Sequence, residues 1–207
     1  TLAAMKNEIN RNQKKHIITV EDPIEYAHKD NQSVIQQREV GIHTHSFQKA
    51  LRAALRENPD VILLGEMRDL ETMQQALTAA ETGHLVFATL HTMGCAESIN
   101  RIIDSFPADQ QNQIRTQLST SLRAIFWQTL IKTKDEKGRV AAIEVMFNNN
   151  AVANMIRKSS THQINSVIET STKEGMQTMK KALTDLLQAG LITEENALLY
   201  MPKEFEA

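Results

Sequence analysis

Short apolar runs alternate with amphipathic helical patterns along the first half of the chain. The β-branched run 16–20, the wholly apolar run 61–64 and the run 84–90 each have the length of a buried strand. Strands without polar alternation are typical of a parallel sheet whose two faces are both covered. Helical patterns precede, separate and follow these runs. They cover 1–10 (apolar at Leu2, Met5 and Ile9), 47–58 (with Ser46 as the expected N-cap), 70–82 and 96–104. This alternation predicts an α/β fold with a parallel-rich sheet flanked by helices.

The pattern changes after Pro107. One long helix is expected over 108–125, followed by strands at 128–132 and 139–147, while 26–45 is expected to hold only short extended pieces near Val34. The remaining patterns are helical and cover 151–157, 161–170, 176–189 and 193–200. We therefore expect a domain boundary near residue 148, between an α/β core and a small C-terminal helical domain.

Composition narrows the class of protein. The formal net charge of the 207 residues is −2, so no broad basic field indicates a nucleic-acid partner. The single cysteine, Cys95, cannot form an internal disulfide or a four-cysteine zinc site, and fits a reducing cytoplasm. The sequence has no apolar run approaching the ~20 residues of a transmembrane helix and no signal-peptide pattern at its start. These features predict a soluble cytoplasmic protein without a transmembrane segment.

Acidic side chains follow two of the predicted strands. Glu21, Asp22 and Glu25 come directly after the strand 16–20, where three carboxylates could act as general base or hold a metal-bound water. The alternative is a solvated acidic turn, which is less favoured because Pro23 fixes the local geometry.

Glu66 follows Gly65 at the tip of the strand 61–64. A rigid apolar strand that ends in a carboxylate is the arrangement of a Walker B site, in which the carboxylate meets Mg²⁺ or its water shell. The alternative is an ordinary strand followed by a polar loop.

Two histidines bracket the third predicted strand. His84 and His91 would stand ~20 Å apart along an extended chain, so they cannot share a metal ion. His91 lies at the C-terminal end, where open α/β sheets bind ligands and a γ-phosphate sensor would lie. His84 lies at the opposite edge, where a structural or interface role is expected; for each histidine, the alternative is a hydrogen-bonded core residue.

Taken in order, these segments resemble the type IV pilus retraction ATPases of the secretion ATPase superfamily. The resemblance spans nearly the whole chain. It is carried by Thr19–Glu25, Gln37–Val40, Ala50–Arg56, Asp60–Thr72, Ala76–Phe87, Thr89–Thr92 and Gly175–Met179.

The resemblance implies a RecA-like ATPase core over 1–148, a helical domain over 149–207, and ATP and Mg²⁺ as substrate and cofactor. It implies that Glu25 activates water, with Glu21 as the alternative, and that His91 monitors the γ-phosphate. The remaining site residues implied by the match are Glu66 (catalytic and Mg²⁺ site), Asp22 (Mg²⁺ site), and Thr89, Gly65 and Arg68 (nucleotide).

A retraction segment of the family matches residues 151–158. It implies a motor role for Ala151, Asn154, Ile156 and Arg157. This sequence departs from the family pattern at Ala153, where the family has arginine, and at Lys158, where it has an acid.

The chain opens where the family's Walker A loop ends. We therefore expect a fragment that neither binds nor hydrolyses ATP appreciably, whereas its parent is a homohexamer at the cytoplasmic face of the inner membrane, working with a pilus platform protein. One alternative is a type II secretion or pilus assembly ATPase, which usually carries a four-cysteine zinc element. A non-catalytic accessory homologue is another, and a nucleic-acid motor is disfavoured because no basic stripe is present.

Overall fold

A computed structural model describes residues 1–202 of the chain, which divides into two compact units. The first unit is Thr1–His91 and the second begins at Thr92. The boundary expected near residue 148 falls inside the second unit, so the division into 1–148 and 149–207 stays a prediction. Residues 203–207 of that predicted domain lie outside the described residues.

The first unit is a parallel sheet with the strand order β2-β1-β3-β4. Its elements in chain order are α1 (Leu2–Asn12), β1 (His16–Glu21), β2 (Val34–Glu39), α2 (Phe47–Ala54), β3 (Val61–Leu64), α3 (Leu70–Glu81) and β4 (Leu85–Ala88). Because all four strands run in the same direction, their C-terminal ends lie at one edge of the sheet. This architecture confirms the predicted α/β class with a parallel-rich sheet.

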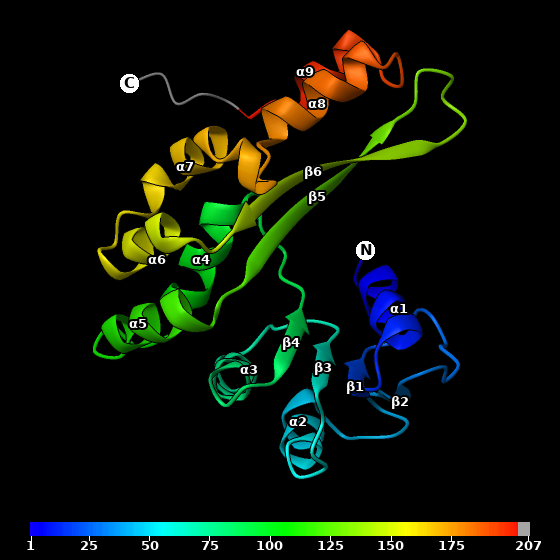
Figure 1. The fold of residues 1–207 in the computed structure, drawn as a ribbon, viewed down its shortest axis with the longest axis vertical. Helices are drawn as coiled ribbons and strands as arrows, with labels where there is room; N and C mark the ends of the chain where they lie inside the picture. Colours follow the sequence, from blue (N-terminus) through cyan, green and yellow to red (C-terminus); the bar gives the residue numbers. More distant parts are fainter. Residues whose placement is uncertain (203–207) are drawn as a thin grey trace. The chain divides into compact units, whose positions relative to one another are not determined.

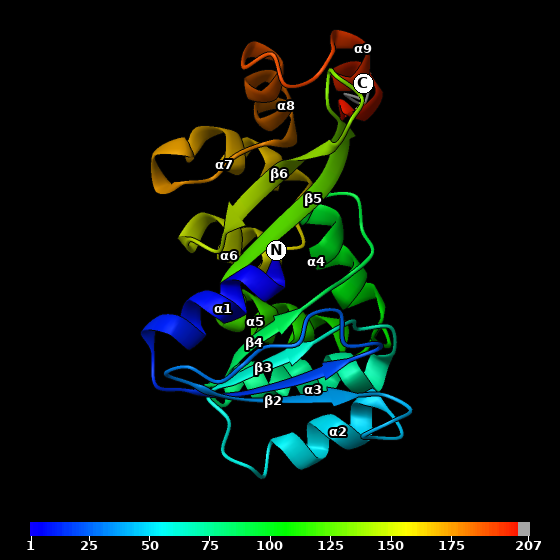
Figure 2. The ribbon, with the colours of Figure 1, turned by 90° about the vertical axis from the view of Figure 1, so that its right-hand side faces the viewer.

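Different helices cover the two faces of this sheet. α2 and α3 pack on one face, and α1 lies on the other (Figures 1 and 2). Strand side chains alternate between faces, and Val20, Ile62 and Leu64 join the core under α2 and α3. Thr19 and Glu21 flank Val20 in β1 and therefore face α1.

The second unit is built around an antiparallel hairpin. β5 (Ala124–Lys132) and β6 (Arg139–Phe147) pair along their full length, and α8 packs on β6 in a core that includes Ile131, Met179 and Leu183. The helices of this unit are α4 (Cys95–Asp104), α5 (Gln111–Ser121), α6 (Asn150–Arg157), α7 (Ile164–Thr170), α8 (Met179–Gln188) and α9 (Glu194–Tyr200), with 3₁₀ turns η1 (Thr161–Gln163) and η2 (Thr172–Glu174). None of the helices within residues 1–202 has the length and hydrophobicity of a membrane-spanning helix.

Several helices are shorter than their sequence patterns predict; the one expected over 47–58, for example, ends at Ala54. The predicted helix 108–125 ends at Ser121, because Leu122 leaves the helical region (φ −58°, ψ 136°) and β5 begins at Ala124. The predicted helix 176–189 begins at Met179, because the Thr178 hydroxyl accepts a hydrogen bond from the Lys181 amide and caps it there. Conversely, the short extended pieces expected near Val34 form the full strand β2, which pairs with β1 along its length.

Candidate functional site

Three predicted strand tips meet at the C-terminal edge of the sheet. Glu21 ends β1, Glu66 follows β3 and His91 follows β4, and these three strands are neighbours in the order β1-β3-β4. Glu66 and His91 come together, with 3.9 Å between Oε2 and Nε2. The structure thus places two of the predicted nucleotide-site residues in direct proximity.

Glu66 is a largely buried carboxylate with exposed partners. Its side chain is 14% exposed, and Oε2 lies 2.7 Å from Nε of Arg68, whose side chain is 74% exposed. The His91 side chain is 83% exposed. A largely buried carboxylate at the rim, with two exposed nitrogen groups beside it, can meet an incoming cation or phosphate.

Gly65 and Thr89 hold the strand tips together. The Gly65 amide donates to Val20 O at 2.7 Å, and a Cβ on Gly65 would lie 3.2 Å from Glu21 Cα. The Thr89 hydroxyl donates to Gly65 O, while the Met67 amide donates to Thr89 O at 3.1 Å. Both residues therefore set the spacing of the tips, and their nucleotide contacts stay predictions.

Glu21 is held in a buried polar cluster on the α1 side of the sheet. Its Oε1 accepts hydrogen bonds from Thr19 Oγ1 at 2.6 Å and Gln37 Nε2 at 3.1 Å. Nζ of Lys6 on α1 lies 3.6 Å from the same oxygen, and the Lys6 side chain is only 2% exposed. Burial lowers the pKa of Lys6, and the Glu21 carboxylate partly offsets this effect.

Asp22 and Glu25 differ from Glu21 because both are exposed. Neither side chain makes a hydrogen bond or ion pair with any described residue. Glu25 is not joined to Glu66 or His91 by such a contact within residues 1–202, so its role as the base stays a prediction. A general base needs a carboxylate that is accessible to the substrate water, and the exposed Glu25 side chain meets this requirement.

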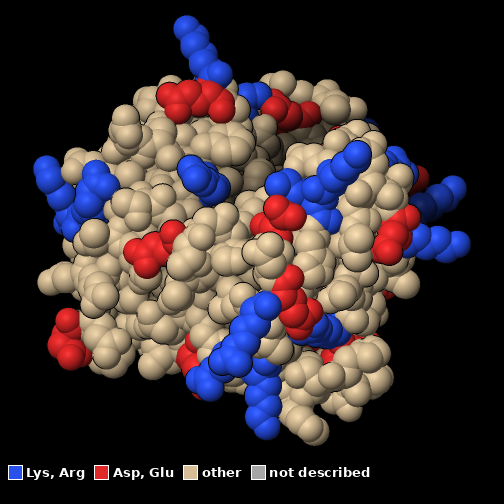
Figure 3. Space-filling view, turned by 60° about the horizontal axis from the view of Figure 1, so that its bottom comes forward, with Lys and Arg blue, Asp and Glu red and all other residues tan. Residues whose placement is uncertain are grey.

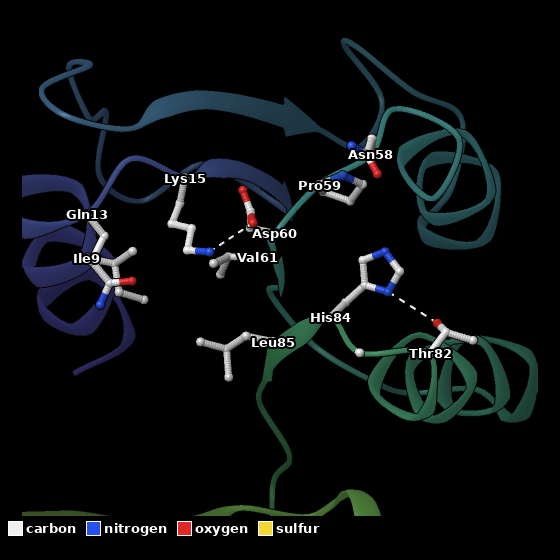
Figure 4. Close-up of a pocket in the computed structure, with 11 residues that line it drawn as sticks. Ile9, Gln13, Lys15, Asn58, Pro59, Asp60, Val61, Thr82, His84 and Leu85 are labelled. Atoms are coloured by element: carbon white, nitrogen blue, oxygen red, sulfur yellow. Dashed lines mark hydrogen bonds and ion pairs between the residues drawn. The ribbon is translucent and has the colours of Figure 1, made fainter.

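His84 lies at the opposite edge of the sheet. It lines a pocket of about 500 Å³ together with Lys15 and Asp60, in the part of the sheet where the strands begin (Figure 4). Its Nδ1 lies 3.0 Å from Ala79 O and 3.2 Å from Thr82 Oγ1. These contacts fit the structural role expected for His84 and separate it from the candidate nucleotide residues.

The predicted retraction segment forms α6 in the second unit. Ile156 is fully buried, while Ala151, Asn154 and Arg157 are exposed. The Asn149 side chain caps the helix by accepting from the amide of Ala151, and Arg157 Nη1 donates to Ser119 Oγ on α5 at 3.1 Å. Ile156 is therefore a core residue, and the three others form the accessible face.

Sequence reasoning missed the cluster around Glu21. Lys6 and Asn10 are the two buried residues of α1, whereas Leu2, Met5 and Ile9, which define its apolar stripe, are only partly buried. A lysine in a helix is normally read as solvated. The i, i+4 spacing of Lys6 and Asn10 was the available signal, since it places both side chains on one face.

The carboxylates predicted to bind Mg²⁺, those of Glu66 and Asp22, are of a chemical type that suits this ion. Within residues 1–202 no group of three His, Cys, Asp or Glu side chains forms a complete metal site. Mg²⁺ in phosphate-transfer sites is bound through one or two carboxylates, with phosphate and water completing the shell. Glu66 and Asp22 are carboxylates that follow β3 and β1 at one edge of the sheet, and their role as Mg²⁺ ligands stays a prediction.

Charged side chains are interspersed on the surface shown in Figure 3, where basic and acidic residues alternate and neither sign gathers in one area. At the candidate site, the charged contacts include the local pairs Glu66–Arg68 and Glu21–Lys6.

Comparisons with known proteins place these features in a family. The family model for type II/IV secretion system proteins matches residues 1–199. A twitching motility protein of Neisseria gonorrhoeae is 55% identical over 197 residues, which are 95% of this chain and 53% of that protein. A type IV pilus retraction ATPase, PilT, of Pseudomonas aeruginosa is 51% identical over 95% of this chain and 57% of its own length.

A solved structure confirms the fold. The crystal structure of the pilus retraction motor PilT with bound ADP superposes with a TM-score of 0.92 at 49% identity, covering 100% of this chain and 58% of that one. The predicted RecA-like fold and the resemblance to retraction ATPases are thus confirmed. The chain spans about half the length of the curated relatives it matches. It belongs to the family of type II/IV secretion system proteins.

Proposed function

We propose that this chain is the C-terminal motor portion of a hexameric ATPase that powers type IV pilus retraction by ATP hydrolysis. One observation carries the proposal: the largely buried Glu66 at the tip of β3 lies 3.9 Å from His91 at the tip of β4. The similarity to a retraction motor with bound ADP supports the assignment of this edge to the nucleotide.

The proposed roles follow from exposure and contacts. Glu25 is exposed and has no partner among residues 1–202, so it is free to act as the base that activates the attacking water. Glu21 is the alternative base, but its Oε1 already accepts two hydrogen bonds and an ion pair. His91 and Arg68 approach the γ-phosphate from the rim, beside Gly65 and Thr89.

Mg²⁺, when bound by Glu66 and Asp22, would neutralise charge that develops on the transferring phosphate. The surrounding protein keeps Glu66 in place, since its position is fixed by β3 and by the Arg68 contact. A phosphate-binding loop must come from another segment, because the 207 residues contain no Gly-x-x-x-x-Gly-Lys-Ser/Thr sequence.

The proposed assembly is a homohexamer at the cytoplasmic face of the inner membrane, in contact with a pilus platform protein. The exposed residues of α6, Ala151, Asn154 and Arg157, form the retraction segment of the second unit. All candidate nucleotide residues lie in the first unit. ATP hydrolysis and force transmission are therefore assigned to different units of the chain.

The test uses the full product of the gene that contains this chain. Glu25→Gln and Glu66→Gln are each expected to lower kcat for ATP hydrolysis about 100-fold or more, because they remove a carboxylate from the reacting site. Glu169→Gln is the matched control, since Glu169 is an exposed carboxylate in α7 without a partner among the described residues.

Each outcome decides the assignment. Loss of activity in the two site variants, with the control unchanged, supports the proposed ATPase. A wild-type gene product without ATPase activity would overturn the proposal in favour of a non-catalytic accessory protein. Site variants as active as the control would overturn the roles assigned to Glu25 and Glu66.

A further inference from the structure

The buried face of α1 is polar. Lys6 and Asn10 are each 2% exposed, and both contact the segment that runs from the end of β1 to the start of β2. Taking a lysine out of water costs several kcal/mol unless a partner compensates. Apolar residues at both Lys6 and Glu21 would fill the same space without that cost, so stability alone does not explain this buried pair.

The side chains of Lys6 and Asn10 contact opposite ends of the segment. Lys6 Nζ lies 3.6 Å from Oε1 of Glu21, at the start. Asn10 Nδ2 donates to Lys29 O at 2.9 Å, and Asn10 Oδ1 accepts from the Asn31 amide at 3.1 Å, near the end. Helix α1 thus anchors both ends of the stretch that carries Glu25.

Strand β2 fastens the middle of the segment. Gln37 Nε2 donates to Tyr26 O at 2.9 Å and its Oε1 accepts from the His28 amide at 2.8 Å. Glu39 Oε2 accepts from the Ile24 amide at 2.9 Å. These bonds use backbone groups and leave the side chains of Asp22 and Glu25 free.

We propose that Lys6 is a positioning residue: its buried ammonium fixes the Glu21 carboxylate at the end of β1 and thereby holds Asp22 and Glu25 in register with Glu66. The inference rests on the proposed ATPase function. Lys6 touches neither the nucleotide nor the reacting water in this scheme and acts through Glu21. The backbones of Glu21 and Gly65 are in close approach, so a shift of Glu21 displaces both strand tips.

The kinetic test compares three variants of the full gene product. Lys6→Met, which keeps the length and removes the charge, is expected to lower kcat about 10- to 100-fold with KM for ATP within about twofold. Lys6→Arg should recover most of the lost kcat because it keeps a donor cation beside Glu21. Lys14→Met is the control, since Lys14 is exposed and has no partner among the described residues.

A second measurement does not depend on activity. Hydrogen–deuterium exchange on the 207-residue chain should show faster exchange in the 21–28 segment of Lys6→Met than in the wild type or in Lys14→Met. Exchange in α3 serves as the internal reference, and circular dichroism checks that each variant is folded.

The outcomes separate the two proposals. A folded Lys6→Met variant with wild-type kcat and wild-type exchange overturns the positioning role and leaves the ATPase proposal intact. A Lys6→Arg variant as impaired as Lys6→Met also overturns it, because charge would then not be the cause. An inactive wild-type gene product overturns the ATPase proposal, and with it this role for Lys6.

Discussion

At Gly65, just after β3, the backbone of β1 approaches so closely that a larger residue would be tightly packed against it. A Cβ there would lie 3.2 Å from Glu21 Cα and 3.3 Å from Val20 O. Both neighbours are main-chain atoms of a buried strand, so neither can move aside by a side-chain rotation.

Gly65→Ala is therefore expected to destabilise the chain by about 1–3 kcal/mol, the usual cost of an overpacked site. Urea unfolding of the 207-residue chain measures it. Gly138→Ala is the control, since a Cβ there meets its nearest neighbour at 3.9 Å. If Gly65→Ala and Gly138→Ala were equally stable, the predicted overpacking at Gly65 would be wrong.

Asp60 links the start of β3 to the start of β1, at the edge of the sheet opposite to the candidate nucleotide site. Its carboxylate accepts from the His16 amide at 2.8 Å and from Lys15 Nζ at 3.0 Å. The hydrogen bond from the His16 amide, followed by the bond from Lys15, lowers the pKa of Asp60 below its ordinary value of 3.8.

A depressed carboxyl pKa gives a defined dependence of stability on pH. The contribution of Asp60 is fully present above its unfolded pKa of about 3.9 and is lost as the pH falls through the lower folded value. The stability difference between wild type and Asp60→Asn should be nearly constant from about pH 5 to about pH 7, where the carboxyl is ionised in both the folded and the unfolded state, and should shrink below about pH 4. Urea titrations at each pH check this, with exposed Asp109→Asn as the control; a difference that grows on acidification would refute it.

Single residues were predictable where a strand dictated their position. Glu66 and His91 follow apolar runs, so their meeting at one edge follows from a parallel sheet. Lys6 was not predictable, because its burial depends on Glu21, a partner brought to it only by the pairing of β1 within the folded sheet. The i, i+4 spacing places Lys6 and Asn10 on one face of α1, but it does not show that this face is the buried one.

At the scale of elements, one carboxylate joins two helices in the second unit. Glu144 on β6 is buried, and its Oε1 accepts from the Cys95 amide at 2.9 Å while Oε2 accepts from the Met179 amide at 3.3 Å. These amides lie at the N-termini of α4 and α8, where the helix dipole favours negative charge.

Glu144→Gln is expected to destabilise the chain by about 1–3 kcal/mol, since an amide cannot accept at both positions and leaves a buried amide unsatisfied. Cys95 provides a second readout, because it is the chain's one cysteine and burial raises the pKa of its thiol. Its alkylation rate at neutral pH should rise in Glu144→Gln and stay at the wild-type value in Glu169→Gln. An unchanged rate would mean that Glu144 does not hold the start of α4.

Element boundaries were less predictable than element types. The apolar periodicity of 108–125 continues across the junction between α5 and β5, so the pattern could not mark the end of the helix at Ser121. Met176–Thr178 read as helix because Met176 and Met179 share its spacing. In the fold, Gln177 instead pairs with Val145 at the edge of β6. Tertiary pairing overrides local preference at both places.

For the whole molecule, the two units separate two kinds of candidate residue. The first unit holds all those assigned to the nucleotide, and the second holds the α6 segment assigned to retraction. We expect the 207 residues alone to show no saturable ATP binding below about millimolar concentration, because their sequence contains no Gly-x-x-x-x-Gly-Lys-Ser/Thr loop to cradle the phosphates. The full gene product should bind ATP in the micromolar range.

Calorimetric titration of both proteins with ATP and Mg²⁺ checks this expectation. Micromolar affinity of the 207 residues would contradict it and would mean that Glu66, Arg68 and His91 suffice to hold a nucleotide.

The polar underside of α1 has a consequence for engineering. A redesign that scores each interior position by packing would replace Lys6 with leucine and Asn10 with alanine. It would leave the buried Glu21 carboxylate without its cation, and the Lys29 carbonyl and Asn31 amide without their side-chain partner. Removing one member of a buried pair is destabilising, so the redesigned protein is expected to melt at a lower temperature as well as to turn over more slowly. Apolar replacements on this face of α1 therefore have to be designed together with the groups that Lys6 and Asn10 contact.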